Sequence, residues 1–405
     1  MSHPKFTSQL LRLFNFSMQA PSIVTLKSTD FFKPLNQFLS PFSLQAKTFS
    51  PLPFAQIILP RPVARQLADL SFVNHIALDT QVFVPEVDPQ CALPSLKGLI
   101  SSKKFKPAPF KNVWPTGDTR EYLGIDSAED NGFTGKGMKV VVIDSDYRIR
   151  TSQLENVKAK NLTKWDMVDT CGHGTHVAST IVGKSLVTKD GYLIKGMAPD
   201  ADLVMLKALS GPLGIGSIST VLAALQEATR HRPDVINLSL GSFPQEHDPL
   251  KLAVEKMAGL AMIVTAAGNT GPTTETIMSP AISEAAITVG SINQKQKVSA
   301  FSARGPTPTG HTKPDVVAPG EGILSSVPKL TYTDWSDFRA NGLAALNGTS
   351  MAAAHISGML LLLKQAGHIS NAEEFKMKLA NLTQQKSNAT GYGLATWGQL
   401  VGASQ

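Results

Sequence analysis

The chain has 405 residues, of which 42% are hydrophobic and 17% are charged. This composition excludes a disordered chain and is sufficient for one large core and a smaller unit. The formal net charge is +7, but the basic residues are scattered, and the densest lysine cluster, at 101–106, lies in a proline-rich stretch. We therefore expect a solvated linker at 101–106 and no nucleic-acid partner.

Residues 1–21 are expected to form a flexible N-terminal segment. Arg12, Asn15 and Ser17 interrupt its apolar stretch, so it contains no convincing signal peptide. Residues 1–29 contain no acidic residue, which is a weak indication of a secreted or exported precursor and leaves the compartment open. No stretch approaches the ~18 apolar residues of a membrane-spanning helix, so no membrane span is expected.

Residues 22–86 show the alternating pattern of a small α+β domain. The pattern predicts strands at 23–26, within 46–59 and at 73–84, with helices at 30–39 and 61–70. Such a ferredoxin-like unit packs its helices on one face of an antiparallel sheet. Residues 87–115 contain prolines and clustered lysines, and we expect a linker there with a processing site.

Residues 116–405 are expected to form one α/β domain. Apolar, β-branched runs predict buried strands, and helix-like stretches at 217–230 and 249–259 alternate with them. The runs lie at 139–143, 203–206, 235–238, 262–265 and 286–289. Strands buried on both faces indicate a mostly parallel central sheet with helices on both faces, and in such sheets catalytic groups gather at the carboxyl ends of the strands.

Ser350 lies at the start of the apolar stretch 351–363, which predicts a buried helix. The free N–H groups and the positive dipole at such a helix start stabilise negative charge that develops beside the hydroxyl. A serine in this position can also be an ordinary N-cap. A catalytic interpretation therefore requires a base and a carboxylate elsewhere in the chain.

Three other polar residues stand at the ends of predicted elements. Asp144 follows the run at 139–143, His173 is flanked by glycines at the start of an apolar helix, and Asn269 closely follows the run at 262–265. Each of them alone commonly has a structural role. Together with Ser350 they supply a carboxylate, a base, a neutral amide donor and a nucleophile, which is the chemistry of acyl transfer.

In this order, Asp144, His173 and Ser350 and the motifs around them resemble the subtilisin-like serine proteases, or subtilases. The matching segments are 124–125, 135–137, 141–145, 172–178, 196–199, 237–241, 266–269, 301–306, 313–320, 348–352 and 391–393. The resemblance implies a subtilisin-like fold and a serine endopeptidase that hydrolyses polypeptides through an acyl-enzyme. It implies that these three residues are the catalytic triad and that Asn269 donates to the oxyanion.

The resemblance also implies where substrate binds. One stretch matches the segment that pairs with the substrate backbone as an added strand: Ser239, Leu240 and Gly241. The opposite wall of the specificity pocket is formed by small residues: Ala266, Ala267 and Gly268. Met278 matches the far end of this pocket, so we expect a shortened apolar pocket.

Residues 22–86 resemble the inhibitory propeptide of this family, most clearly at 64–82. The resemblance implies an autoprocessed zymogen, in which the chain's own N-terminal domain is an intramolecular inhibitor until the linker is cut. A permanent accessory domain is the alternative.

Four positions depart from the family pattern: Asp146, Ser179, Ala353 and Ala354. None of the departures removes a catalytic atom, but a second carboxylate close to Asp144 can disturb its ionisation. We expect an altered rate rather than lost activity. A catalytically impaired subtilase scaffold that acts as a binding protein is the alternative function.

A metal site is a competing interpretation of the segment around His173. Asp169, Cys171, His173 and His176 lie within eight residues, and two histidines three apart on a helix can bind zinc. The sequence lacks the Glu of an H-E-x-x-H motif, so we expect no metal ligands and no cofactor in the chemistry. Structural calcium is compatible with the resemblance, but no acid-rich loop places it.

The chain contains two cysteines, Cys91 and Cys171. A disulfide framework is therefore excluded, whereas a single bridge is not. Cys171 has three open interpretations: an apolar filler, a redox-sensitive thiol or a partner of Cys91.

Overall fold

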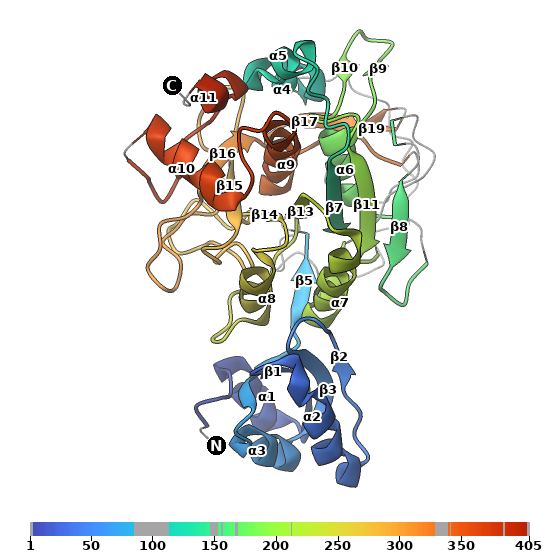
Figure 1. Cartoon of the computed structure of the whole chain (residues 1–405), viewed down its shortest axis with the longest axis vertical. Coiled ribbons are helices and arrows are strands. Elements are labelled where there is room, and N and C mark those ends of the chain that lie inside the picture. Colours follow the sequence, from blue (N-terminus) through green and yellow to red (C-terminus); the bar gives the residue numbers. More distant parts are fainter. Residues whose placement is uncertain are drawn as a thin grey trace.

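The computed structural model of the chain describes residues 3–84, 113–145, 153–154, 157–166, 169–211, 213–328, 339–340, 342–383 and 385–402. Figure 1 shows a small unit, which contains the N-terminus and comprises residues 3–84, and a large unit formed by the described residues from 113 on. Most of the expected processing region at 87–115 lies outside the described residues, as do Cys91 and Asp146.

The small unit is an antiparallel sheet covered by helices, as the sequence predicted. Its strands lie in the order β2 (Lys47–Thr48), β3 (Phe54–Pro60), β1 (Gln19–Leu26) and β4 (Val73–Leu78). The two expected helices are α2 (Phe32–Leu39) and α3 (Arg61–Asp69). In α3 the spacing of Val63, Ala64, Leu67 and Ala68 places them on one buried face, which packs into the core of the unit.

Helix α1 (Ser8–Phe16) occupies much of the segment that was expected to be flexible. Thr7 caps it by accepting a hydrogen bond from the N–H of Leu10. Leu10 and Phe14, four residues apart, are buried in the core of the small unit, whereas Arg12 and Asn15 face solvent. The polar residues that interrupt the apolar stretch in the sequence thus lie on the outer face of an amphipathic helix, and the small unit begins before residue 22.

The large unit is built on a seven-stranded parallel sheet, which confirms the predicted α/β fold. The strand order is β16-β15-β14-β13-β7-β11-β8. The bounds are β7 (Lys139–Asp144), β8 (Lys158–Asn161), β11 (Asp202–Lys207), β13 (Val235–Leu238), β14 (Met262–Ala266), β15 (Ile287–Ile292) and β16 (Val316–Pro319).

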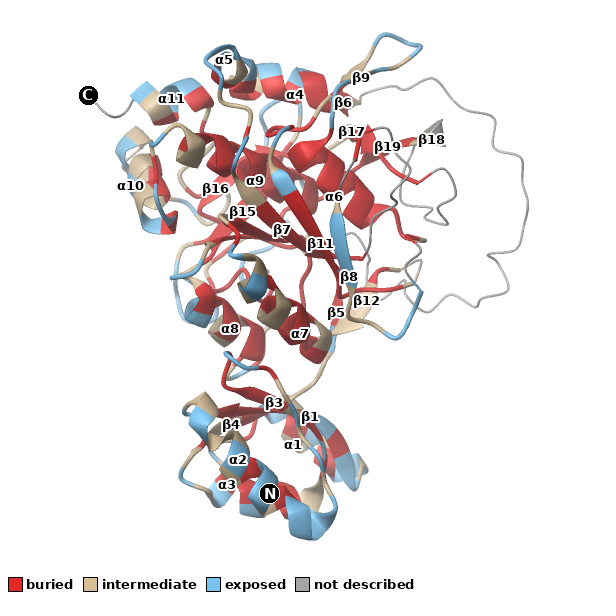
Figure 2. Ribbon diagram, turned by 45° about the vertical axis from the view of Figure 1, so that its right-hand side comes forward, coloured by how far each residue is buried: buried red, intermediate tan, exposed pale blue. Residues whose placement is uncertain are grey.

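Helices cover both faces of this sheet and create two cores. Val140 and Val142 of β7 pack in one core with α6 (His173–Val182) and α9 (Thr349–Gln365). Val141 and Ile143 pack in the other with α7 (Ile218–Ala228) and α8 (Pro249–Met257). Successive side chains of a strand point to opposite faces, so a fully apolar strand such as β7 requires both layers. Figure 2 shows β7 and β11 as buried strands between them.

The remaining elements are mostly short segments of the large unit, and two of the 3-10 turns belong to the small unit. They are β6 (Trp114–Pro115), α4 (Thr116–Leu123), α5 (Ile125–Asp130), β9 (Leu186–Val187), β10 (Leu193–Ile194), β12 (Ile215–Ser217), β17 (Ile323–Ser326), β18 (Arg339–Ala340), β19 (Leu343–Leu346), α10 (Ala372–Leu382) and α11 (Trp397–Gly402), with 3-10 turns at Thr29–Phe31, Ser40–Phe42 and Thr229–His231. None of the helices within the described residues is long and apolar enough to cross a membrane.

The strand expected at 73–84 is divided between the two units. β4 ends at Leu78 in the small sheet, whereas β5 (Gln81–Phe83) pairs antiparallel with β12 of the large unit. Figure 1 shows β5 running from the small unit into the large unit beside α7. The expected single strand was wrong for a physical reason. Both 73–78 and 81–83 have the residue pattern of a strand, but this pattern does not specify which strand each of them pairs with.

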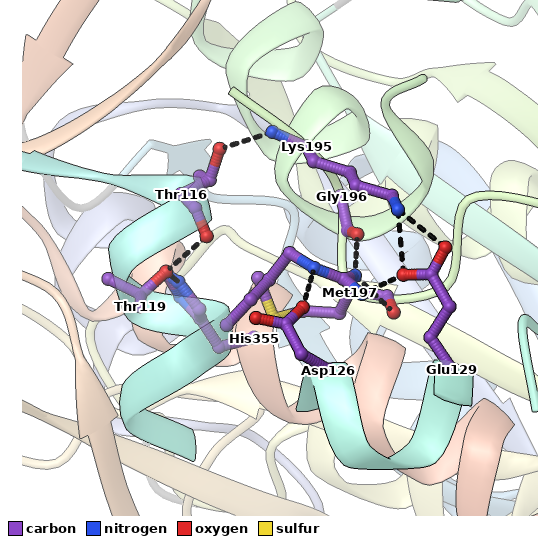
Figure 3. A network of polar contacts seen from close by, with 9 residues as sticks. Thr116, Thr119, Asp126, Glu129, Lys195, Gly196, Met197 and His355 are labelled. Carbon is purple, nitrogen blue, oxygen red and sulfur yellow. Dashed lines mark hydrogen bonds and ion pairs between the residues drawn. The ribbon is translucent and has the colours of Figure 1, made fainter. Parts of the chain in front are cut away.

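A fully buried arginine joins the first helices of the large unit to a distant turn. Arg120, on α4, contacts the carboxylates of Asp126 (3.0 Å) and Glu129 and donates to the carbonyls of Gly196 and Met197. Figure 3 shows the two carboxylates on α5 and the carbonyls beside them. Because a buried charge is costly unless it is paired and hydrogen-bonded, this network fixes the position of α4 and α5.

Candidate active site

Asp144 and His173 meet at the carboxyl end of β7. Oδ1 of Asp144 lies 2.7 Å from Nδ1 of His173, and both side chains are buried. The same oxygen accepts a hydrogen bond from the N–H of Ser145 (2.6 Å). His173 is the first residue of α6, and Gly172 before it has a φ of 81°, in the left-handed region that favours glycine. The structure thus brings together the carboxylate and the imidazole that the sequence singled out.

Ser350 is the second residue of α9, which packs against α6. Its hydroxyl donates to the carbonyl of Ser239 (3.5 Å), and the Ser239 hydroxyl donates to the carbonyl of Ser350 (3.2 Å). Ser350 therefore lies beside the segment that the sequence predicted as the edge of the substrate cleft. It stands in the first turn of a helix, as His173 does, and these two helices are neighbours.

His355, which the sequence analysis did not assign, holds the turn that carries Ser350. Its Nδ1 lies 2.7 Å from the carbonyl oxygen of Met351, and its Nε2 lies 2.7 Å from Oγ1 of Thr119 on α4. Burial lowers the pKa of His355 to about 4, so the ring is neutral at neutral pH. Nδ1–H then donates to the Met351 carbonyl. Figure 3 shows the contact between Nε2 and Thr119, whose hydroxyl also lies 3.0 Å from the carbonyl oxygen of Thr116. The available signal was its position as one of two polar interruptions of the apolar helix.

Asn269 is oriented by the residue that precedes Ser350. Its Oδ1 accepts hydrogen bonds from the N–H (3.0 Å) and the hydroxyl (2.9 Å) of Thr349. The N–H of Gly268 in turn donates to the Thr349 hydroxyl (3.1 Å). With its carbonyl oxygen held in this way, Asn269 presents its NH₂ group as the remaining donor.

The cleft edge at 239–241 is paired with the end of the small unit. Gly241 exchanges two hydrogen bonds with Phe83, each of 2.9 Å, and the N–H of Val84 donates to the carbonyl of Gly214 (3.1 Å). On the other side, β5 pairs with β12 in the register Ile215 with Phe83. Residues 81–84 therefore form the middle strand of three. The sequence predicted one neighbour of this strand, at 239–241, but not β12, although the glycines at 211, 214 and 216 were a signal for close backbone approach.

Met278 fills the space between the two predicted pocket walls. A Cβ added to Gly268 would lie 2.5 Å from Cγ of Met278, and one added to Gly241 would lie 3.2 Å from its Cβ. The N–H of Met278 donates to the carbonyl of Ala267 (3.0 Å). The Leu240 side chain is buried in the core that also contains Val82 and Val84. Ala266 is the last residue of β14.

Further contacts join the two units. Asp79 accepts a hydrogen bond from the N–H of Ser219 (2.9 Å), in the first turn of α7, and Gln245 donates to the carbonyl of Leu78 (3.1 Å). The rings of His75 and His247 stack, with centroids 3.6 Å apart and an interplanar angle of 9°. The small unit thus contacts the predicted edge of the substrate cleft, a helix start and a loop of the large unit.

The residues proposed for a zinc site have other contacts. Nε2 of His176 lies 2.9 Å from the carbonyl oxygen of Ile323, and burial lowers the pKa of this histidine to about 3. Asp169 accepts from the N–H of Gly172 (2.6 Å) and from the hydroxyl of Thr175. Within the described part of the chain, no three His, Cys, Asp or Glu side chains are grouped to hold a metal ion.

The side chain of Gln153 holds the segment that follows α6 in the chain. Its amide NH₂ donates to the carbonyls of Lys184 and Ile194, both at 2.8 Å, and its Oε1 accepts from the hydroxyl of Ser326. A side-chain amide thus holds both ends of the β9–β10 hairpin against β17.

Cys171 and the departures from the family pattern lie mostly in the core. The Cys171 thiol is buried, and its burial raises its pKa, as expected for an apolar filler. Ser179 is buried in α6, and its hydroxyl has no hydrogen-bond partner among the described residues. Ala353 and Ala354 are buried in α9.

The chain matches known proteins over most of the large unit. The model of the subtilase family matches residues 125–394. A major intracellular serine protease of Bacillus subtilis is 35% identical over 261 residues, which cover 62% of this chain and 74% of that protein. Subtilisin DY of Bacillus licheniformis is 31% identical over 276 residues, or 67% of this chain and 92% of the relative. Subtilisin Savinase of Lederbergia lenta is 34% identical over 274 residues, or 66% and 91%. The chain therefore belongs to the subtilase family and is a subtilisin-like serine endopeptidase.

Proposed function

We propose that Asp144, His173 and Ser350 are the catalytic triad of this endopeptidase and that the chain is an autoprocessed zymogen. The observation that carries the proposal is the 2.7 Å contact between Asp144 and His173, at the head of a helix that packs against the helix of Ser350. A carboxylate on Nδ1 fixes the imidazole tautomer in which Nε2 can accept a proton.

The reaction proceeds in two steps. Ser350 Oγ turns from the Ser239 carbonyl and attacks the substrate carbonyl carbon while His173 takes its proton. His173 gives this proton to the leaving amine as the C–N bond breaks, which leaves an ester on Ser350. Water then loses a proton to His173 and hydrolyses the ester, which releases the carboxylic acid and restores the serine.

Asn269 and the N–H of Ser350 stabilise the oxyanion of both tetrahedral intermediates. Thr349 holds the amide oxygen of Asn269, so the NH₂ group is directed by contacts that exist before substrate binds. Donors that are already oriented stabilise developing charge without a cost of reorganisation. This chemistry requires neither a metal nor a cofactor.

The small unit inhibits the enzyme by occupying the cleft. Residues 81–84 add a strand between 214–217 and 239–241, which is the way an extended peptide binds an open sheet edge. Cleavage of the linker at 87–115 then releases this strand from covalent attachment, and loss of the small unit opens the cleft.

A mass measurement of the full-length chain tests this function. The purified protein is incubated with and without a fluorophosphonate, and its intact mass is followed with time. We expect an adduct on Ser350 and loss of the small unit by a cut within 87–115. Labelling without any cut would support the triad and favour a permanent accessory domain. A folded chain that never labels would favour the impaired scaffold that binds without hydrolysis.

Met278→Ala should widen the specificity pocket. In the wild type the Met278 side chain occupies the space between Gly241 and Gly268, so we expect small or short apolar residues before the cut. Removing it should raise kcat/KM for Phe relative to Ala at this position by about tenfold or more, because a methylene in an apolar pocket is worth about 1–3 kcal/mol. Profiling with a peptide library measures the ratio. A strong wild-type preference for Lys or Arg would contradict the apolar pocket.

Acid should weaken the contact between the two units. Burial, followed by the charges of His247 and Lys5, lowers the pKa of His75 below its ordinary 6.5, and Glu246 opposes this shift. The docked state therefore favours neutral His75, so docking is strongest above about pH 6.5 and is lost as the pH falls through the lowered pKa. Burial raises the pKa of Asp79. The docked state therefore favours the protonated form of Asp79, which strengthens docking at more acidic pH.

Hydrogen exchange of the Ser350→Ala chain measures this effect without catalysis. After correction for intrinsic rates, we expect faster exchange at 73–84 at about pH 5 than at about pH 8. His75→Gln should remove most of the difference. Slower exchange in acid would contradict the prediction.

A further inference from the structure

Residues 81–84 present their side chains to two different surroundings. Val82 and Val84 are fully buried in the core that contains Leu240. Phe83, between them, projects to the other face of the strand, as alternation requires. There its ring lies 6.0 Å from the ring of Phe243, at an interplanar angle of 58°. Phe83 thus has an aromatic partner on the large unit.

Ile215 lies beside Phe83 on the same face of the sheet as Phe243. It stands directly opposite Phe83 in the pairing of β5 and β12, and opposed residues of an antiparallel pair share a face. A cavity of about 540 Å³ is lined by these three side chains and by residues of the small unit that include Leu78. When the small unit leaves, Ile215 and Phe243 of this lining remain on the large unit.

Phe243 is a large aromatic residue that stays exposed on the large unit. It is 58% exposed even with the small unit in place, and its ring contacts the ring of Phe83. A large exposed aromatic residue beside a cleft is typical of a recognition surface. Its backbone neighbour Ser242 exchanges two hydrogen bonds with Ser279 (2.9 and 3.0 Å), which holds the chain beside Gly241.

We propose that Phe243 and Ile215 form a specificity subsite for an aromatic substrate side chain, at the position where the substrate residue exchanges two hydrogen bonds with Gly241. The proposal rests on the proposed function, because it takes residues 81–84 as a guide to how a substrate strand binds. The subsite is separate from the Met278 pocket, and it selects a different residue of the substrate.

The test compares peptides of the form Gln-Val-Xaa-Val with a common C-terminal part, in which Xaa is Phe, Leu or Ala. The processed wild type should cleave the Phe peptide about 2- to 12-fold better in kcat/KM than the Leu peptide, which is the size of an aromatic pair beyond simple burial. Both Phe243→Ala and Phe243→Leu should reduce this Phe/Leu ratio to about one. Mass spectrometry confirms that all peptides are cut at the same bond.

Leu260→Ala is the matched control. Leu260 is another exposed apolar residue of the large unit (57%). It precedes β14 and so lies at the amino ends of the strands, whereas the proposed cleft lies at their carboxyl ends. Its Phe/Leu ratio should equal that of the wild type. An unchanged ratio in Phe243→Ala, with fluorophosphonate labelling of Ser350 intact, would overturn the subsite alone. Failure of the wild type to label would overturn the proposed function and the subsite with it.

Discussion

Ser350→Ala is expected to leave the chain at full length and to reduce peptide hydrolysis by about 10⁴-fold or more. The substitution removes the one oxygen that can form the acyl-enzyme, whereas the contact between Asp144 and His173 and the anchoring of Asn269 stay in place. Only direct attack by water would remain. The fold should be preserved, because the hydrogen bond that the hydroxyl donates to the Ser239 carbonyl is long, at 3.5 Å.

Three measurements on this variant check the prediction together. Intact mass should stay constant during incubation, a fluorophosphonate should not add, and hydrolysis of a peptide should fall by about 10⁴-fold or more, to the residual rate that the oxyanion donors and substrate binding support. Ser127→Ala, at an exposed serine of helix α5, is the control and should process and label as the wild type does. If Ser350→Ala were cut at 87–115 in the absence of other proteases, autoprocessing would be ruled out.

Asp144→Asn has the second largest expected effect, a fall in kcat of about 10⁴-fold. Asparagine fits the same volume, but its amide can hold the imidazole in the tautomer whose Nε2 carries a proton. Such a ring cannot take the proton of Ser350. The change is electrostatic and tautomeric, so the unfolding temperature should change far less than the rate does.

Kinetics of peptide hydrolysis and of fluorophosphonate labelling check the second prediction. Both should slow, because both require deprotonation of Ser350. Asp202→Asn is the matched control, since Asp202 is the exposed first residue of the neighbouring strand β11, at its amino end, and its loss should leave both rates unchanged. A fall of less than about tenfold in Asp144→Asn would show that His173 does not depend on this carboxylate.

The order of elements and the positions of the chemistry could be predicted from local pattern. Runs such as 139–143 are apolar on both faces, and this property specifies a strand between two helical layers wherever the run occurs. Asp144, His173, Asn269 and Ser350 stand at or close to the ends of such elements, and a parallel sheet gathers the carboxyl ends of its strands on one side. Local pattern was insufficient at α1, where polar residues on the outer face of a helix resembled a break in an apolar segment.

The sequence by itself therefore determined the two-unit organisation, the α/β class and the four candidate catalytic residues, because hydrophobic periodicity and motif spacing are properties of short segments. Only the tertiary structure decided that β5 leaves its own sheet to pair with β12 and Gly241, that Met278 fills the pocket, and that Phe243 meets Phe83. Each of these contacts joins residues that are distant in sequence. Their formation depends on packing and backbone pairing between separate elements, which no local pattern contains.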